Sequence, residues 1–191
     1  MRVVGGRFAG RKLAALGGGA PEAALRPTSD KVRESLFNII AHGDYPPLEG
    51  GRALDLFAGT GALAIEALSR GAARAVLVEE HPKARAIIRE NLDALGLNGV
   101  AKLFRRDATR LGPNRSEPFT HVFLDPPYGR GLGEKAIGAA LQGGWVADDA
   151  LIMLEEAAET EVAVDGLERV DQRRYGETQI LLFRRSPQAP N

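Results

Sequence analysis

The sequence of 191 residues contains no cysteine, carries no net charge and has no long apolar run. Without cysteine, the chain has no disulfide, no thiolate nucleophile and no thiolate metal ligand. None of its apolar runs approaches the roughly 18 residues that a membrane-spanning helix needs, and the N-terminus lacks the apolar segment of a secretory signal. These absences predict a cytoplasmic protein that does not contact a membrane.

Metal ligands of the usual kinds are also scarce. The chain has only three histidines, His42, His81 and His121. They lie far apart in the sequence and do not show the spacing of a metal site. The sequence therefore predicts that no metal takes part in the function.

The 25 basic and 25 acidic residues cancel, but they are unevenly distributed. The first 33 residues carry seven lysines and arginines against one glutamate and one aspartate, a net charge of +5. This asymmetry predicts an anionic partner for the N-terminal part of the chain. A basic segment that is simply solvated would show the same pattern.

The pattern of apolar residues indicates the fold class. Apolar residues make up 44% of the chain and charged residues 26%, as in an ordinary globular domain. The expected strands are 53–58, 75–80, 101–108, 121–125 and 150–156, and the expected helices are 62–71, 82–96 and 133–144. This alternation predicts an α/β fold with a parallel sheet covered on both faces. Two further runs, 167–175 and 178–185, predict an antiparallel hairpin at the sheet edge.

The N-terminal region is expected to form a small extension. Residues 2–14 contain two short β-prone runs around Gly-Gly and Ala-Gly, which predict a hairpin or an extended arm. Pro27 and Thr28 then begin an amphipathic helix. Its packing face is expected to comprise Val32, Leu36, Ile39 and Ile40. We therefore divide the chain into an arm with its linker (1–26), a main domain (27–185) and a disordered tail (186–191).

The segment "DLFAGTGALA" places a glycine-rich turn between an expected strand and an expected helix. Glycines let the backbone approach a ligand, and open α/β sheets bind ligands outside the carboxyl ends of their strands. Glu79 ends the next strand about 20 residues on, where a carboxylate can accept from both ribose hydroxyls, and Glu80 could take the same role. Asp107, at the end of the third strand, could accept from an adenine amine. The pattern predicts a nucleoside cofactor, either NAD or S-adenosylmethionine.

The stretch "FLDPPYG" at 123–129 decides between these cofactors. Its two prolines donate no hydrogen bonds and restrict the backbone, so they end a central strand in a stiff loop. The Asp125 carboxylate and the Pro126 carbonyl can accept from both N–H groups of a nucleobase amine and localise its lone pair on nitrogen. Tyr128 offers a ring on which the base can stack. The loop therefore predicts methyl transfer from S-adenosylmethionine.

Together, "ALDLFAGTGALAIEALSRGA", "VLVEE" and "FLDPPY" resemble the motifs of class I S-adenosylmethionine-dependent amino-methyltransferases. The blocks "RVVGGRFAGRKL", "RPTSDKVRESLFNII" and "YGETQILLF" are similar to the RsmD family of bacterial 16S rRNA guanine-N(2) methyltransferases. The resemblance implies a Rossmann-like, doubly wound sheet of seven strands with an antiparallel last strand. It also implies methylation of the exocyclic amine of a guanine in 16S ribosomal RNA.

The resemblance assigns roles to individual residues. The residues expected to bind the donor are Asp55, Ala58, Gly59, Thr60, Gly61, Glu79, Asp107 and Ala108. The residues expected to hold the guanine amine are Asp125, Pro126, Pro127 and Tyr128. The basic residues expected to contact RNA, from the arm and the amphipathic helix, are Arg7, Arg11, Lys12, Arg26 and Arg33.

Two other functions share parts of this pattern. The Asp-Pro-Pro-Tyr motif is shared with adenine and cytosine amino-methyltransferases of DNA, although 191 residues leave no room for a target-recognition domain. A non-catalytic RNA-binding assembly factor could keep the same fold. Because phosphate neutralisation dominates RNA affinity and the net charge is zero, the expected substrate is an assembling small ribosomal subunit. The protein is expected to act as a monomer.

Overall fold

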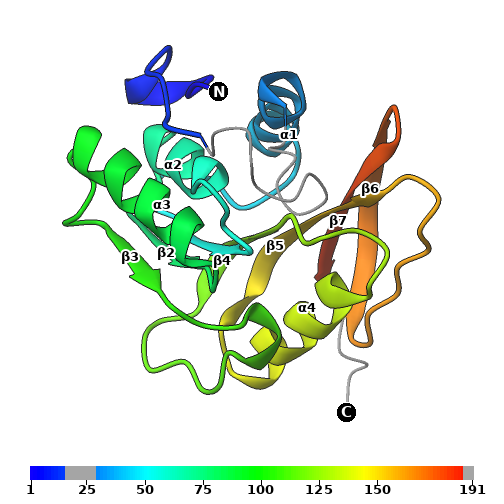
Figure 1. The fold of residues 1–191 in the computed structure, drawn as a ribbon. Coiled ribbons are helices and arrows are strands. Elements are labelled where there is room, and N and C mark those ends of the chain that lie inside the picture. The colour runs from blue at the N-terminus through cyan, green and yellow to red at the C-terminus, as the bar shows by residue number, and fades with distance from the viewer. Residues whose placement is uncertain (16–28, 187–191) are drawn as a thin grey trace.

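The structure is a computed structural model, and it describes residues 1–15 and 29–186 (Figure 1). Its centre is a seven-stranded sheet with the order β3-β2-β1-β4-β5-β7-β6. The strands are β1 (Arg52–Leu56), β2 (Arg74–Val78), β3 (Ala101–Phe104), β4 (Phe119–Leu124), β5 (Val146–Ala157), β6 (Leu167–Tyr175) and β7 (Thr178–Arg185). The helices are α1 (Asp30–His42), α2 (Ala62–Ser69), α3 (Pro82–Ala94) and α4 (Leu132–Gln142), with short 3-10 turns η1 (Gly6–Phe8) and η2 (Ala108–Arg110).

Strands β1 to β5 pair in parallel, and β7 pairs antiparallel with both β5 and β6. The reversed direction of β7 follows from the tight turn between β6 and β7, where Gly176 has a φ of 62°. Glycine adopts this left-handed conformation without steric cost. The predicted class I fold, with a doubly wound sheet and an antiparallel last strand, is confirmed.

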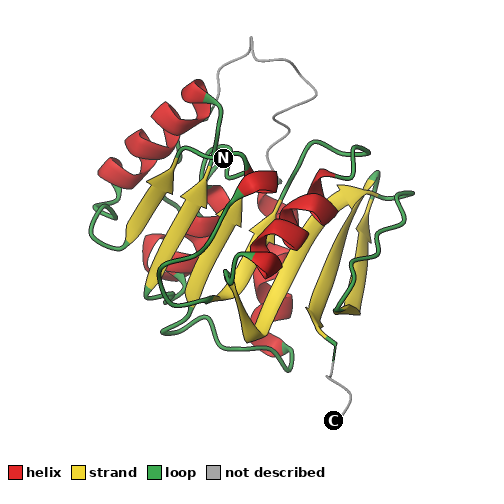
Figure 2. Cartoon of the chain, turned by 90° about the horizontal axis from the view of Figure 1, so that it is seen from below, coloured by secondary structure: helices red, strands yellow, loops and turns green. Residues whose placement is uncertain are grey.

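Helices cover both faces of the sheet, as Figure 2 shows. One apolar core lies between the sheet and α1, α2 and α3, and a second lies between the sheet and α4 with η2. Neighbouring strand residues serve opposite cores: Ala53 belongs to the first and Leu54 to the second. The strand order reverses between β1 and β4, so the crevice at their carboxyl ends is where this fold class binds ligands.

Helix α1 packs with its predicted face, which is wider than expected. Ser29 caps its N-terminus and accepts a hydrogen bond from the Val32 backbone N–H at 3.2 Å. The buried residues are Arg33, Leu36, Phe37 and Ile40. Val32 and Ile39, which were expected in the packing face, are half-buried and pack against the core. The prediction of the packing face was therefore correct but incomplete, since it left out Phe37 and the buried Arg33.

The described part of the N-terminal arm is a hairpin-like loop docked on the helices. A bridge pairs Arg2 with Lys12. The Val4 N–H donates to Glu66 of α2 at 2.8 Å, and the Ala14 N–H donates to Asn91 of α3 at 2.7 Å. The predicted division at residues 26 and 27, and all but the first residue of the predicted tail, lie outside the described residues. In the described ranges, no helix is long and apolar enough to cross a membrane.

Candidate active site

The glycine-rich turn after β1 has an unusual backbone. Gly59 and Gly61 have φ angles of 56° and 79°, and Phe57, which is not a glycine, has a φ of 62°. A positive φ at a bulky residue costs free energy, and such strain concentrates at functional sites. At Gly61 a Cβ atom would also lie 2.9 Å from the Leu77 side chain. The turn therefore requires glycine both for its conformation and for its close packing.

Asp55 lies beneath this turn and is almost completely buried, with 1% of its surface exposed. Its Oδ2 accepts a hydrogen bond from the Ala64 backbone N–H at 3.0 Å, which ties the end of β1 to the first turn of α2. Burial raises the pKa of Asp55 to about 7, with a further rise from Glu79, while the bond from Ala64 lowers it. Asp55 thus supports the turn from below, and a direct contact with a donor stays a prediction.

Glu79, after β2, faces the glycine turn. Its Oε2 accepts from the Gly59 backbone N–H at 2.8 Å, and its Oε1 accepts from the His81 backbone N–H at 2.7 Å. Glu80 is exposed, and its backbone carbonyl accepts from the Arg85 guanidinium. Of the two adjacent glutamates, only Glu79 is bonded to the turn.

Asp107 follows β3, the third strand along the same sheet edge. Its Oδ1 accepts from the Thr109 backbone N–H at 2.8 Å and from the Thr109 hydroxyl at 2.7 Å. The hydroxyl bond is the main reason that the pKa of Asp107 is lowered, so the group is a carboxylate at neutral pH. Ala108, also predicted at the donor site, is buried, and Thr60 in the turn is half-buried.

The Asp125–Tyr128 segment, which we call the acceptor loop, leaves the sheet beside the glycine turn. In the parallel pairing of β1 with β4, Leu56 lies opposite Leu124. The residues that follow, Phe57 in the turn and Asp125 in the loop, therefore emerge at the same level from adjacent strands. The fold thus brings the predicted donor-binding and amine-holding residues together at its topological switch point.

Two buried glutamates at the end of β5 hold the acceptor loop. The Tyr128 hydroxyl donates to Glu155 Oε1 at 2.9 Å, and the Gly129 backbone N–H donates to Glu156 Oε1 at 2.9 Å. Burial, followed by the charges of Asp125 and Glu155, raises the pKa of Tyr128 above its ordinary range, so its hydroxyl remains a donor. Sequence reasoning missed both glutamates, although carboxylates that end an apolar strand were the signal that pointed to Glu79.

Known proteins share this sequence and architecture. The family model described as Conserved hypothetical protein 95 matches residues 1–184. "Ribosomal RNA small subunit methyltransferase D" of Escherichia coli strain K12 is 41% identical over 160 residues, which are 83% of this chain and 76% of that protein. The chain belongs to the RsmD family.

Two further RsmD-like proteins match almost the whole chain. "Putative rRNA methyltransferase YlbH" of Bacillus subtilis is 36% identical, over 97% of this chain and 99% of that protein. The solved structure "Putative methyltransferase yhhF from Escherichia coli" has a TM-score of 0.81 at 34% identity, and the match covers 98% of this chain and 99% of that one. The family resemblance inferred from the sequence is thus confirmed.

The basic residues predicted to contact RNA fall into three groups in this RsmD-family chain. Arg7, Arg11 and Lys12 are exposed on the arm, where they are free to meet an anionic partner. Arg26 lies outside the described residues. Arg33 is completely buried, so the prediction that it contacts RNA is wrong.

The burial of Arg33 has a clear physical reason. Its Nη2 donates to Asp30 Oδ1 at 2.8 Å and also to the Arg2 backbone carbonyl, and its Nε lies 3.6 Å from Glu66 Oε2. Glu66 is itself completely buried in α2. Glu66 also accepts from Arg70 Nε at 2.8 Å, so the two arginines share this buried carboxylate. Arg33 therefore joins α1, α2 and the arm, and it does not face solvent.

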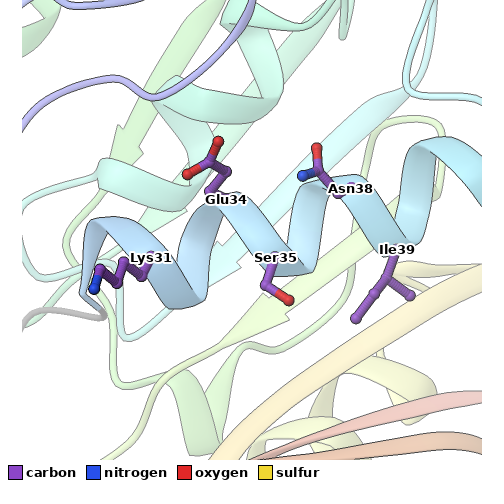
Figure 3. A pocket seen from close by; sticks show the side chains of 5 residues that line it. All are labelled: Lys31, Glu34, Ser35, Asn38 and Ile39. Atoms are coloured by element: carbon purple, nitrogen blue, oxygen red, sulfur yellow. The ribbon is translucent and has the colours of Figure 1, made fainter.

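The outer side of α1 borders an open hollow of about 490 Å³ (Figure 3). The lining residues all come from this helix: Lys31, Glu34, Ser35, Asn38 and Ile39. The Ser35 hydroxyl lies 2.6 Å from the Tyr175 hydroxyl of β6, so the hollow lies next to the β6–β7 hairpin. Its lining combines one basic, one acidic and two uncharged polar residues with the apolar Ile39. In the described part of the chain, no group of His, Asp and Glu side chains could hold a metal ion.

Proposed function

We propose that this protein is an S-adenosylmethionine-dependent methyltransferase that methylates the N2 amine of a guanine in 16S ribosomal RNA. One observation carries the proposal: the glycine turn and the acceptor loop leave adjacent parallel strands at the same level. Donor and acceptor sites would then share one crevice. The relatives named as rRNA methyltransferases support ribosomal RNA as the substrate.

The residues around the glycine turn fit S-adenosylmethionine. The Glu79 carboxylate faces the turn and can accept from a ribose diol, and the Asp107 carboxylate can accept from an adenine amine. Asp55 would support the donor site from below the turn, through its bond to the Ala64 N–H. The donor, when bound, supplies a methyl group that is activated by its positively charged sulfur.

The acceptor loop would prepare the guanine amine for attack. The Asp125 carboxylate and the Pro126 carbonyl would accept from its two N–H groups, which localises the lone pair on nitrogen. Pro126 and Pro127 keep the loop stiff, so the two acceptors are in place before the base arrives. Stacking on Tyr128 would contribute about 1 to 3 kcal/mol to base binding. The amine becomes acidic as the new bond forms, and Asp125 can then take its proton.

RNA phosphates would be contacted by the exposed basic residues of the arm, which are Arg7, Arg11 and Lys12. Arg26 is predicted to contact RNA as well. The polar side chains of the hollow along α1 could add hydrogen bonds to the same substrate. Because the chain has no net charge, it would bind naked RNA weakly and would need the shaped surface of an assembling small subunit. Such a substrate would place the protein, acting as a monomer, in the cytoplasm.

The test is methyl transfer to small subunits from a strain that lacks the enzyme, followed by mass spectrometry of the nucleosides. The wild type should produce N2-methylguanosine, and Asp125→Ala should lower the turnover at least a hundredfold. Asp165→Ala is the matched control. This aspartate is exposed and lies just before β6, away from the acceptor loop.

Three outcomes would overturn the proposal. Wild-type turnover by Asp125→Ala would show that the acceptor loop takes no part in methyl transfer. Methylation of duplex DNA in place of the subunit would make the protein a DNA amino-methyltransferase. Binding to the subunit with no affinity for S-adenosylmethionine in calorimetry would make it a non-catalytic assembly factor.

A further inference from the structure

Glu155 and Glu156 are two consecutive carboxylates buried at the carboxyl end of β5, with 4% and 1% of their surfaces exposed. Burying a carboxylate is unfavourable unless it receives hydrogen bonds or a counter-charge. Successive residues of a strand point to opposite faces of a sheet. Both glutamates nevertheless bond to the same stretch of chain, Glu155 to Tyr128 in the acceptor loop and Glu156 to Gly129 directly after it.

The register of the sheet places Glu155 beside the catalytic end of the loop. Leu124 of β4 pairs with Leu154 of β5, so Asp125 and Glu155 follow at the same level on neighbouring strands. Parallel strands lie about 4.8 Å apart. Glu155 therefore lies close to the acceptor loop. It bonds to the loop at Tyr128, whose hydroxyl donates to it at 2.9 Å.

The bond to Glu155 restricts the ring of Tyr128. The hydroxyl lies at the far end of the ring, on the axis about which the ring turns, so the hydrogen bond fixes where the far end of the ring lies. Glu156 holds the next residue, because its Oε1 accepts from the Gly129 N–H at 2.9 Å and from the Ala157 N–H at 2.8 Å. Gly129 has a φ of 69°, where the chain turns away from the acceptor loop.

We propose that Glu155 is a positioning residue for the methyl acceptor, which fixes the position of the Tyr128 ring, and that Glu156 fixes the exit of the acceptor loop. The inference rests on the proposed function and names the residues that pre-organise its substrate site. Pre-organised acceptors need no rearrangement at the moment of reaction, so a loosened loop would lower the rate of methyl transfer more than the binding of the donor.

The first experiment measures single-turnover methyl transfer to undermodified small subunits, together with donor affinity by calorimetry. Glu155→Ala should lower the transfer rate at least tenfold and leave the donor Kd within twofold of the wild type. Glu155→Gln keeps an oxygen that accepts from the hydroxyl, and should stay within threefold of the wild-type rate. Val146→Ala is the control for lost stability, because it removes buried side-chain atoms at the far end of β5.

A double-mutant cycle tests whether Glu155 acts through Tyr128. Tyr128→Phe keeps the ring but loses the hydroxyl, and should lower the rate as much as Glu155→Ala. The double variant should be no slower than either single variant. A Glu155→Ala rate equal to that of Val146→Ala, or losses that multiply in the double variant, would overturn the inference.

A readout without substrate separates this inference from the proposed function. The chain has three tyrosines, so NMR of protein labelled with ¹³C in its tyrosine rings can resolve Tyr128 from Tyr45 and Tyr175. Glu155→Ala should shift or broaden the Tyr128 signals alone, whether or not the ribosomal subunit is the substrate. Unchanged Tyr128 signals would contradict the inference, whereas a wild type that cannot methylate the subunit would contradict only the proposed function.

Discussion

Glu79 and Glu80 are adjacent in the sequence, yet their surroundings differ. Glu79 bonds to the backbone of the glycine turn, whereas Glu80 is exposed. If Glu79 holds the ribose of the donor, Glu79→Ala should raise the donor Kd at least tenfold, because two hydrogen bonds to a charged group are lost. Glu80→Ala should leave the Kd within twofold. Calorimetry with S-adenosylmethionine measures both, and the reverse ranking would move the ribose contact to Glu80.

The raised pKa of Asp55 predicts how the free energy of unfolding depends on pH. In the folded protein Asp55 keeps its proton up to its pKa of about 7, whereas in the unfolded chain it releases the proton near pH 3.8. Between these values the folded state binds the extra proton, so the free energy of unfolding falls as the pH rises, by up to about 1.4 kcal/mol per pH unit.

Urea unfolding at pH 5 and pH 7 checks this dependence when wild type is compared with Asp55→Asn. The variant cannot ionise but keeps an oxygen that can accept from Ala64. Between the two pH values the wild type should lose about 2 to 3 kcal/mol more than the variant. The same loss in both proteins would show that Asp55 ionises in the fold as it does in water.

At the scale of the elements, the buried Arg33 of α1 bonds to the arm and pairs with the buried Glu66 of α2. Replacing Arg33 would leave the Arg2 carbonyl without this donor, while Glu66 would keep Arg70 as its cation. Arg33→Leu should therefore lower the free energy of unfolding by about 1 to 3 kcal/mol. Arg11→Leu is the control, because Arg11 is exposed on the arm and its loss should change stability little.

Urea unfolding and subunit binding separate the two arginines. Arg33→Leu should be the less stable protein, and Arg11→Leu should be the one that binds the small subunit more weakly. Wild-type stability of Arg33→Leu together with a loss of subunit affinity would contradict this account and would support the RNA contact first predicted for Arg33.

An element can be predicted from the sequence when local contacts determine its structure, and it cannot when distant contacts do. The strands and helices from residue 53 onward follow from apolar periodicity, and their order in the chain was predicted correctly. The buried face of α1 was predicted only in part, because Arg33 is buried through its distant partners Glu66 and Arg2. The bonds of Glu155 to Tyr128 and of Glu156 to Gly129 also join separate segments, and no local pattern reveals them.

At the scale of the whole molecule, the topology of the sheet assembles the site. The carboxyl ends of β3, β2, β1, β4 and β5 follow one another along a single edge. They carry Asp107, Glu79, the glycine turn, the acceptor loop and the buried glutamate pair, respectively. Residues that are spread over about 100 positions of the sequence therefore meet at one edge of the sheet. The carboxylates proposed to bind the donor lie on one side, and the proposed amine acceptors lie on the other.

A crystal structure of the protein with S-adenosylhomocysteine and guanosine tests this arrangement most directly. We expect the Glu79 carboxylate on the ribose, and the Asp125 carboxylate and Pro126 carbonyl oxygens directed at the guanine amine beside the sulfur of the ligand. Oxygens that point away from the ligand, behind packed side chains, would contradict the proposed chemistry.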